Sequence, residues 1–248
     1  IMKILIIGDS CIDKFIYGEC DRICPEAPVP VFSPINSTKN DGMAKNVFNN
    51  FKSLAPNWDI DFITNPNGII KTRLVDVKTN QMLLRIDDND KCSRFTGLDK
   101  LEEYDAVVIS DYNKGFLNEE DIEYIVNKYP LTFIDSKKIF GEWVMNTSFI
   151  KINHQEYEKN KENLVDYKGQ LIVTLGEKGV KWGNLIHPPS RQAEVSDLSG
   201  AGDTFFASFV YHYLSHKSIS NSIYFAQNCS LEVIEKKGVV VVKNNLVT

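Results

Sequence analysis

The sequence lacks the features that mark several classes of protein. No apolar run approaches the roughly 20 residues that a membrane-spanning helix needs, and the apolar run at 3–7 is too short for the core of a secretion signal. Basic residues are not in excess, because 28 Lys and Arg stand against 33 Asp and Glu, giving a net charge of −5. Non-specific nucleic-acid binding needs a basic surface. We therefore expect a cytoplasmic protein that binds neither membranes nor nucleic acid.

Cysteine is also scarce. The chain has five cysteines, an odd number, and only Cys20 and Cys24 lie close together in the sequence. Structural zinc sites combine two closely spaced pairs of ligands, and disulfide-rich domains use cysteines in even numbers. The pattern therefore favours reduced thiols over a zinc site or a disulfide framework.

What the sequence does contain is a repeated alternation of short apolar runs with helical patterns. This alternation is typical of an α/β protein with a mostly parallel sheet covered by helices. With 248 residues and 43% hydrophobic composition, the chain can bury one large core, and we expect residues 1–248 to form a single domain. The expected buried strands are 3–7, 106–109, 131–134, 148–152 and 171–174. The expected helices are 41–54, 118–128, 201–214 and 220–236.

Four of the expected strands end in polar or small residues. These endings are Gly8-Asp9, Ser110-Asp111, Asp135-Ser136 and Asn153-His154. In open α/β sheets, ligands bind beyond the carboxyl ends of the strands. The sequence therefore predicts a binding site along this rim of the sheet.

Two segments, about 14–34 and 71–88, do not fit the alternation. The first carries Pro25, Pro28 and Pro30 close together, and prolines suit an edge strand or a bulge. The second is typical of a hairpin that turns near 78–81. We expect them to form a small separate sheet that stands over the rim as a lid. Its apolar side chains would be covered either by the lid of a second subunit, giving a homodimer, or by the domain itself.

The most informative segment is Asp197–Thr204, a glycine-rich turn followed by an apolar helical run. Its glycines let a ligand approach the backbone, and the free N–H groups of a helix start favour an anion such as a phosphate. Asp203 would repel a phosphate, but it is well placed to take a proton from a hydroxyl that attacks one. The alternative is an ordinary helix start, in which Asp203 complements the helix dipole.

The segment Asp197–Thr204 resembles the second signature of the ribokinase-like, or phosphofructokinase-B, family of carbohydrate kinases. The remaining blocks are similar to one branch, the kinase domain of bifunctional heptose 7-phosphate kinase/heptose 1-phosphate adenylyltransferases. These blocks are Gly8–Asp13, Tyr17-Gly18, Arg22–Val31, Lys71–Arg73, Leu84–Asp87, Ser110–Gly115, Ile134–Lys137 and Asn153–Glu156. The resemblance covers nearly the whole chain in order and implies a ribokinase-like three-layer sandwich with a small β-lid.

The resemblance implies a role for each matching residue. Asp203 corresponds to the base that deprotonates the sugar hydroxyl, and the amides of Gly200, Ala201 and Gly202 to the groups that hold the transferring phosphoryl group. The implied substrate-binding residues are Asp13, Gly42 and Asn46. The implied nucleotide-binding residues are Asn153, Glu156, Thr174, Gly176, Gly179, Asn228 and Gly238. Position adds further candidates: Asp111 on the inferred rim and Arg73 and Arg85 on the expected lid for the substrate, and Lys137 on the rim for the nucleotide.

The implied cofactors are ATP and Mg²⁺, with a monovalent cation left open, and Glu156 is associated with Mg²⁺ through water. On spacing alone, Asn153 and Glu156 are more often part of an exposed helix start, and Gly176 and Gly179 indicate an ordinary turn between two strands. A helix start is expected to lower the pKa of Asp203, which matters little for a base if proton removal comes late in the reaction.

A substrate that already carries a phosphate needs a second cationic site. Lys71, Arg73 and Arg85 on the expected lid, and Arg22, are the candidates, with plain surface charge as the alternative.

Three departures from the family pattern bear on function. Asp41 stands at the first glycine of the first signature, and Phe48 where a small residue is usual, which leaves the shape of the sugar pocket open. The segment 51–71 is short, so we expect the sheet to lose an edge element. No His-x-Gly-His motif is present, so we do not expect these residues to carry out adenylyl transfer.

The sequence thus predicts ATP-dependent phosphorylation of a sugar hydroxyl, with a heptose phosphate as the expected acceptor. The alternatives are a kinase for another hexose, a ketose phosphate or a nucleoside, and a non-catalytic homologue that binds nucleotide or sugar.

Overall fold

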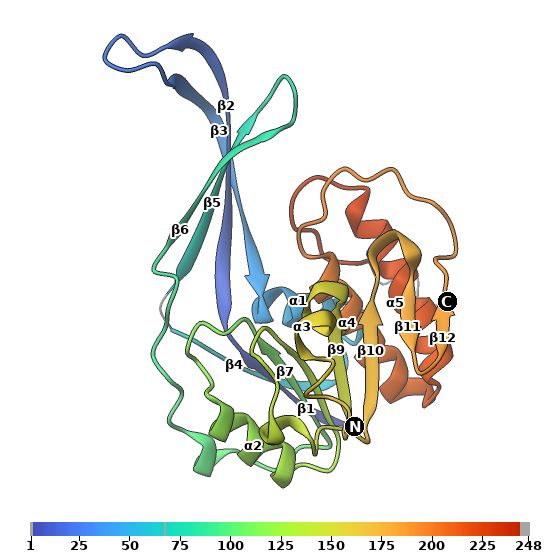
Figure 1. The fold of residues 1–248 in the computed structure, drawn as a ribbon. Helices are drawn as coiled ribbons and strands as arrows, with labels where there is room; N and C mark the ends of the chain where they lie inside the picture. Colours follow the sequence, from blue (N-terminus) through green and yellow to red (C-terminus); the bar gives the residue numbers. More distant parts are fainter. Residues whose placement is uncertain (1, 67, 244–248) are drawn as a thin grey trace.

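The structure is a computed structural model that describes residues 2–66 and 68–243. Within these residues the main sheet has the strand order β12-β11-β10-β9-β8-β7-β1-β4 (Figure 1). The strands are β1 (Lys3–Gly8), β4 (Asp59–Thr64), β7 (Ala106–Asp111), β8 (Thr132–Ser136), β9 (Phe149–Asn153), β10 (Gln170–Thr174), β11 (Val180–Trp182) and β12 (Leu185–His187). Neighbouring strands of the series β4, β1, β7, β8, β9 and β10 pair in parallel. Strands β11 and β12 add to the β10 edge in antiparallel pairing.

Helices cover both faces of this sheet. On one face lie α1 (Ala44–Leu54), α4 (Ala201–His216) and α5 (Ile219–Ile234), and on the other α2 (Glu119–Lys128) and α3 (His154–Asn160). Strand β1, between β7 and the edge strand β4, shows why both faces are needed. Ile4 and Ile6 pack with the first group, and Leu5 and Ile7 with the core that contains α2. A strand buried on both faces is a continuous apolar run. The expected three-layer α/β architecture is confirmed.

The expected small sheet is also present. It has the strand order β3-β2-β5-β6, formed by β2 (Ser10–Ile23), β3 (Pro30–Met43), β5 (Ile69–Asp76) and β6 (Met82–Asp88). Figure 1 shows these strands standing away from the main sheet, with β2 continuing from β1. The sheet is longer than the predicted segments, and below we call it the β-lid.

The apolar side chains of the β-lid divide into two sets. Phe15 and Val75 are buried within the chain, whereas Val77, Met82 and Leu84 are 40%, 54% and 53% exposed. Exposed apolar residues on an open strand edge are typical of a surface that another chain covers. Homodimerisation through the β-lid stays a prediction.

Two expectations for residues 41–71 were wrong. Asp41 does not begin a helix, because β3 runs on to Met43 and α1 begins at Ala44. The sheet has not lost its edge element, since β4 pairs along the whole of β1. A tight turn, in which Trp58 N–H donates to the Ala55 carbonyl at 3.2 Å, leads straight from α1 into β4. The short segment is therefore long enough for the strand.

Two further findings concern the cysteines and the helices. All five cysteines carry free thiols. In the described part of the chain, none of the helices combines the length and the apolar character that crossing a membrane requires.

Candidate active site

The rim predicted from the strand endings exists, and aspartates lie along it. Asp9, Asp111 and Asp135 follow or end β1, β7 and β8, and all three are buried. Asp9 accepts backbone N–H groups from Tyr112 and Lys114 at 2.8 and 3.1 Å and from Phe116 at 3.2 Å. Burial, with Asp111 nearby, raises the pKa of Asp9. Asp9 therefore supports the loop that follows β7.

Asp203 lies where the glycine-rich turn enters α4. Gly200 caps the helix in the left-handed conformation (φ 80°), and a Cβ there would come within 2.7 Å of the Asn46 amide nitrogen. Asp203 sits on the first helical turn and is only 5% exposed. Its carboxylate accepts hydrogen bonds from the Tyr112 hydroxyl at 2.6 Å and from Asn46 Nδ2 at 3.1 Å. Each carboxylate oxygen thus holds one donor.

The pKa of Asp203 is raised to about 6. Burial is the largest cause, and the charge of Asp135 adds to it, whereas the bonds from Tyr112 and Asn46 and the charge of Lys151 act in the opposite direction. The expectation that the pKa of Asp203 is lowered was wrong, because removal of water from the carboxylate outweighs its two hydrogen-bond donors and the Lys151 charge. A carboxylate with this pKa is ionised at neutral pH and is a stronger base than an ordinary aspartate.

A row of charges lies beside the helix start, with Asp135 and Lys151 buried and Lys137 and Glu156 partly exposed. Asp135 bonds to Lys151 at 2.5 Å and to Lys137 at 2.9 Å, and Lys137 also reaches Glu156 at 2.7 Å. Burial alone would raise the pKa of Asp135, but the two lysines lower it. A Cβ on Gly202 would lie 3.3 Å from the Lys151 ammonium nitrogen. The glycine therefore leaves the Lys151 cation next to the N-terminus of α4.

The predicted acceptor residues at the base of the β-lid come together. Asp13 is buried, and Arg73 forms an ion pair with it. The Arg73 guanidinium also lies 5.1 Å from the centre of the Phe15 ring. A Cβ on Gly42 would come within 2.1 Å of Asp13 Oδ2, so only glycine leaves room for that carboxylate. Arg85, on the neighbouring strand, is paired instead with Asp87 at 2.7 and 2.6 Å.

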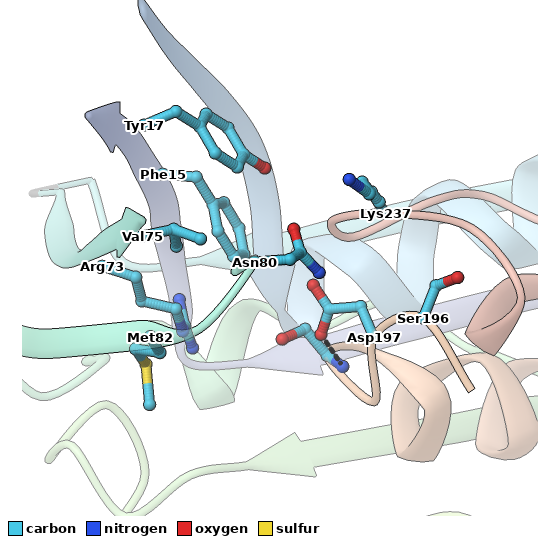
Figure 2. Close-up of a pocket in the computed structure, with 10 residues that line it drawn as sticks. Phe15, Tyr17, Arg73, Val75, Asn80, Met82, Ser196, Asp197 and Lys237 are labelled. Carbon is cyan, nitrogen blue, oxygen red and sulfur yellow. Dashed lines mark hydrogen bonds between the residues drawn. The ribbon is translucent and has the colours of Figure 1, made fainter. Parts of the chain in front are cut away.

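A cavity of about 210 Å³ lies between the β-lid and the turn that leads into α4 (Figure 2). The lid contributes Phe15, Tyr17, Arg73, Val75, Asn80 and Met82, and the body contributes Ser196, Asp197, Ser199 and Lys237. Asp197 is held in place by the N–H groups of Ser199 at 2.8 Å and Gly238 at 3.1 Å. Of the predicted site residues, Arg73 lines this cavity, whereas Asp13, Asn46 and Asp203 are not among its lining residues.

The predicted nucleotide residues lie after β8, at the ends of β9 and β10 with the elements that follow them, and on and after α5. Asn153 caps α3 and exchanges hydrogen bonds with Glu156, in which each side chain accepts the backbone N–H of the other residue. This is the capping box of an ordinary helix start. Gly176 and Gly179 lie in the turn between β10 and β11, both with positive φ. Their nucleotide roles stay predictions.

The remaining predicted residues lie in these positions. Thr174 ends β10, where its hydroxyl donates to the Ile152 carbonyl at 3.4 Å. Asn228, on α5, accepts a hydrogen bond from Ser190. Gly238 has φ 75° beside the Asp197 carboxylate. Asp111 is buried and paired with Lys138 at 2.8 Å, which points to a structural role, and its substrate role stays a prediction.

Sequence reasoning missed Tyr112 and Lys151 as site residues. A lysine in the otherwise apolar strand β9 was a readable signal, because a buried lysine needs an anionic partner. Nothing local marks Tyr112, whose partner lies 91 residues away. Among residues 2–66 and 68–243, no group of three or more His, Cys, Asp or Glu side chains is placed to hold a metal ion.

Comparison with known proteins also indicates a carbohydrate kinase. The model of the pfkB family carbohydrate kinases matches residues 118–244. The bifunctional protein HldE of Helicobacter pylori strain J99 is 31% identical over 293 aligned residues, which cover 95% of this chain and 63% of that protein. HldE of a Nitratiruptor species is 29% identical, with 95% and 62% covered. The chain thus spans less than two thirds of the length of these curated relatives.

Solved structures show the same architecture. Ribokinase from Thermotoga maritima matches with a TM-score of 0.77 at 15% identity, covering 100% of this chain and 98% of that one. Phosphofructokinase-2 from Escherichia coli in complex with potassium matches with a TM-score of 0.74 at 12% identity, covering 99% and 97%. The fold is therefore ribokinase-like.

Proposed function

The chain belongs to the pfkB family of carbohydrate kinases, and on that premise we propose that it transfers the terminal phosphoryl group of ATP to a hydroxyl of a sugar phosphate, with a heptose phosphate as the preferred acceptor. The observation that carries the proposal is Asp203. Its buried carboxylate has a pKa of about 6 and lies on the first turn of a glycine-started helix at the carboxyl rim of the sheet. The first turn of α4 therefore supplies both the base and the N–H groups that bind an anion.

The proposed reaction uses these groups in a simple order. Asp203 accepts the proton of the acceptor hydroxyl as the hydroxyl oxygen bonds to the phosphorus. The bond from that phosphorus to the bridging oxygen breaks, and ADP leaves with the bonding pair. In this proposal the N–H groups at the start of α4 and the Lys151 ammonium neutralise charge on the phosphoryl oxygens, which is the main requirement of a loose transition state.

The nucleotide side supports ATP with a divalent cation. Kinase families of this kind use both, and we propose Mg²⁺, held mainly by phosphate oxygens and water, with Glu156 in the outer shell. The carboxylate of Glu156 already bonds to Lys137 and to the Asn153 N–H, so it fits a water-mediated contact better than a direct one. Bound there, the cation would offset the charge of the phosphates. Lys137, Asn153, Thr174, Gly176, Gly179, Asn228 and Gly238 complete the proposed nucleotide site.

The acceptor side supports a phosphorylated sugar. Asp13 and Asn46 can bind hydroxyls, and Arg73 and Lys237 bring positive charge to the cavity under the β-lid. Arg85 lies one strand away, opposite Arg73 in the register of β5 and β6. The similarity to HldE directs the choice of acceptor to a heptose phosphate. We further propose a cytoplasmic homodimer that covers the exposed apolar side chains of the β-lid.

The test is ADP release measured with matched acceptors. A heptose 7-phosphate should support turnover, the unphosphorylated heptose should do so with a much higher KM, and Asp203→Asn should reduce kcat by about 10³-fold or more while leaving the Kd for ATP nearly unchanged. Asp203→Asn activity near that of the wild type would overturn the assignment of the base. ATP binding without turnover on any sugar, sugar phosphate or nucleoside would instead indicate a non-catalytic binding protein.

A further inference from the structure

Tyr112 contacts the proposed base but has no part in the reaction described above. It lies in the loop after β7, and its hydroxyl donates to Asp203 Oδ1 at 2.6 Å. The loop is fixed from below, since the Tyr112 N–H donates to Asp9 at 2.8 Å and Asp9 holds two further N–H groups of the same loop. The hydroxyl is therefore held in one place relative to the carboxylate.

Two ammonium groups lie over the Tyr112 ring. Lys71 of the β-lid is 5.7 Å from the ring centre, and Lys137 of the nucleotide side is 5.2 Å from it. Contacts of this length between a cation and an aromatic face are attractive. Tyr112 thus contacts the β-lid through Lys71, the proposed base through its hydroxyl, and the row of charges that contains Glu156 through Lys137.

We propose that Tyr112 is a positioning residue for the phosphoryl transfer: its hydroxyl holds Asp203 Oδ1 in the anionic form and directs the free lone pairs of the carboxylate to the acceptor hydroxyl. The inference rests on the proposed function. An ionised carboxylate can accept about four hydrogen bonds, and Tyr112 and Asn46 each supply one. Room for the acceptor therefore remains while both oxygens are held.

The groups that face Asp203 fix the direction of the expected effect. Asp135 on β8 raises its pKa and Lys151 on β9 lowers it, while the neighbouring Cys11 thiol on β2 has a pKa of about 12 and stays neutral. Burial and the charge of Asp203 hold the pKa of Tyr112 well above its ordinary value, so the phenol keeps its proton and remains a donor. Loss of the phenol hydrogen bond must raise the pKa of Asp203 further.

The first experiment is the pH profile of kcat/KM for Tyr112→Phe, which keeps the ring and both cation contacts. The acidic limb should move upward by about one pH unit or more, because a hydrogen bond to a charged group is lost. The KM for ATP should not change. An acidic limb that stays at the wild-type position would overturn the proposal.

Tyr104→Phe is the matched control. The Tyr104 hydroxyl donates to Asp61 at 2.8 Å, and its ring packs in the core on the α2 side of the sheet, so the variant removes the same kind of bond away from the site. Its acidic limb should coincide with that of the wild type. An equal shift in both variants would show a general effect of lost stability and would overturn the role given to Tyr112.

A second measurement separates this inference from the proposed function. Titration of ¹³C-labelled aspartate carboxyls, with the Asp203 signal assigned from Asp203→Asn, reports the pKa without any acceptor. It should be higher in Tyr112→Phe, and lower when 3-fluorotyrosine, a more acidic donor, replaces Tyr112. An unchanged titration in the Phe variant overturns the inference, whereas absence of sugar-dependent turnover in the wild type overturns only the proposed function.

Discussion

Replacement of the base should stabilise the protein as it removes activity. The carboxyl of Asp203 has a pKa of about 6 in the folded chain against an ordinary value of 3.8. Between these values the folded protein binds more protons than the unfolded chain, so this group favours folding at low pH and opposes it as pH rises. The amide that replaces the carboxyl in Asp203→Asn does not titrate, so the variant escapes that loss.

The size of the effect follows from the two pKa values. A difference of about 2 pH units corresponds to about 3 kcal/mol, and roughly half of it develops between pH 5 and pH 8. The amide also changes the hydrogen bonds with Tyr112 and Asn46, which adds an offset of about 1 kcal/mol. That offset is nearly independent of pH, so the change of the free-energy difference with pH is the informative quantity.

Urea unfolding of both proteins at several values of pH measures this change. The unfolding free energy of Asp203→Asn minus that of the wild type should increase by about 1 to 1.5 kcal/mol from pH 5 to pH 8. A flat difference would refute the raised pKa. A difference that falls with pH would show that the helix start and the donors outweigh burial.

Two further substitutions test the acceptor side and the rim. Gly42→Ala should lower kcat/KM for the sugar by about tenfold or more, because the new Cβ would meet the Asp13 carboxylate at 2.1 Å. Gly68→Ala is the control, since the nearest atom to its Cβ would be Ile12 Cδ1 at 3.9 Å. Equal kinetics for the two variants would contradict the steric argument. Lys138→Met should lower the unfolding free energy by about 3 to 5 kcal/mol, because Asp111 would keep a buried charge without its cationic partner. A loss below about 1 kcal/mol in urea unfolding would show that the ion pair with Lys138 is not needed to stabilise the buried Asp111.

Local sequence was sufficient for the elements whose signals are local. The run Ile4–Ile7 is apolar on both faces and lies in strand β1, which is buried on both sides of the sheet. The hairpin of β5 and β6 turns where its polar residues indicate. The predicted lid segments were too short, and β4 was missed, because strand ends and edge strands depend on pairing partners that are distant in the chain.

The sequence by itself determined the buried strands β1, β7, β8, β9 and β10, the rim that carries the aspartates and the position of Asp203 at a glycine-started helix. The tertiary structure decided the hydrogen bonds of that carboxylate, since its partners Asn46 and Tyr112 lie 157 and 91 residues away along the chain. It also decided the sign of the pKa change. Burial is a property of the whole packed molecule, and it is the largest cause of the raised pKa of Asp203. The dipole of a helix start, by contrast, can be read from the local sequence.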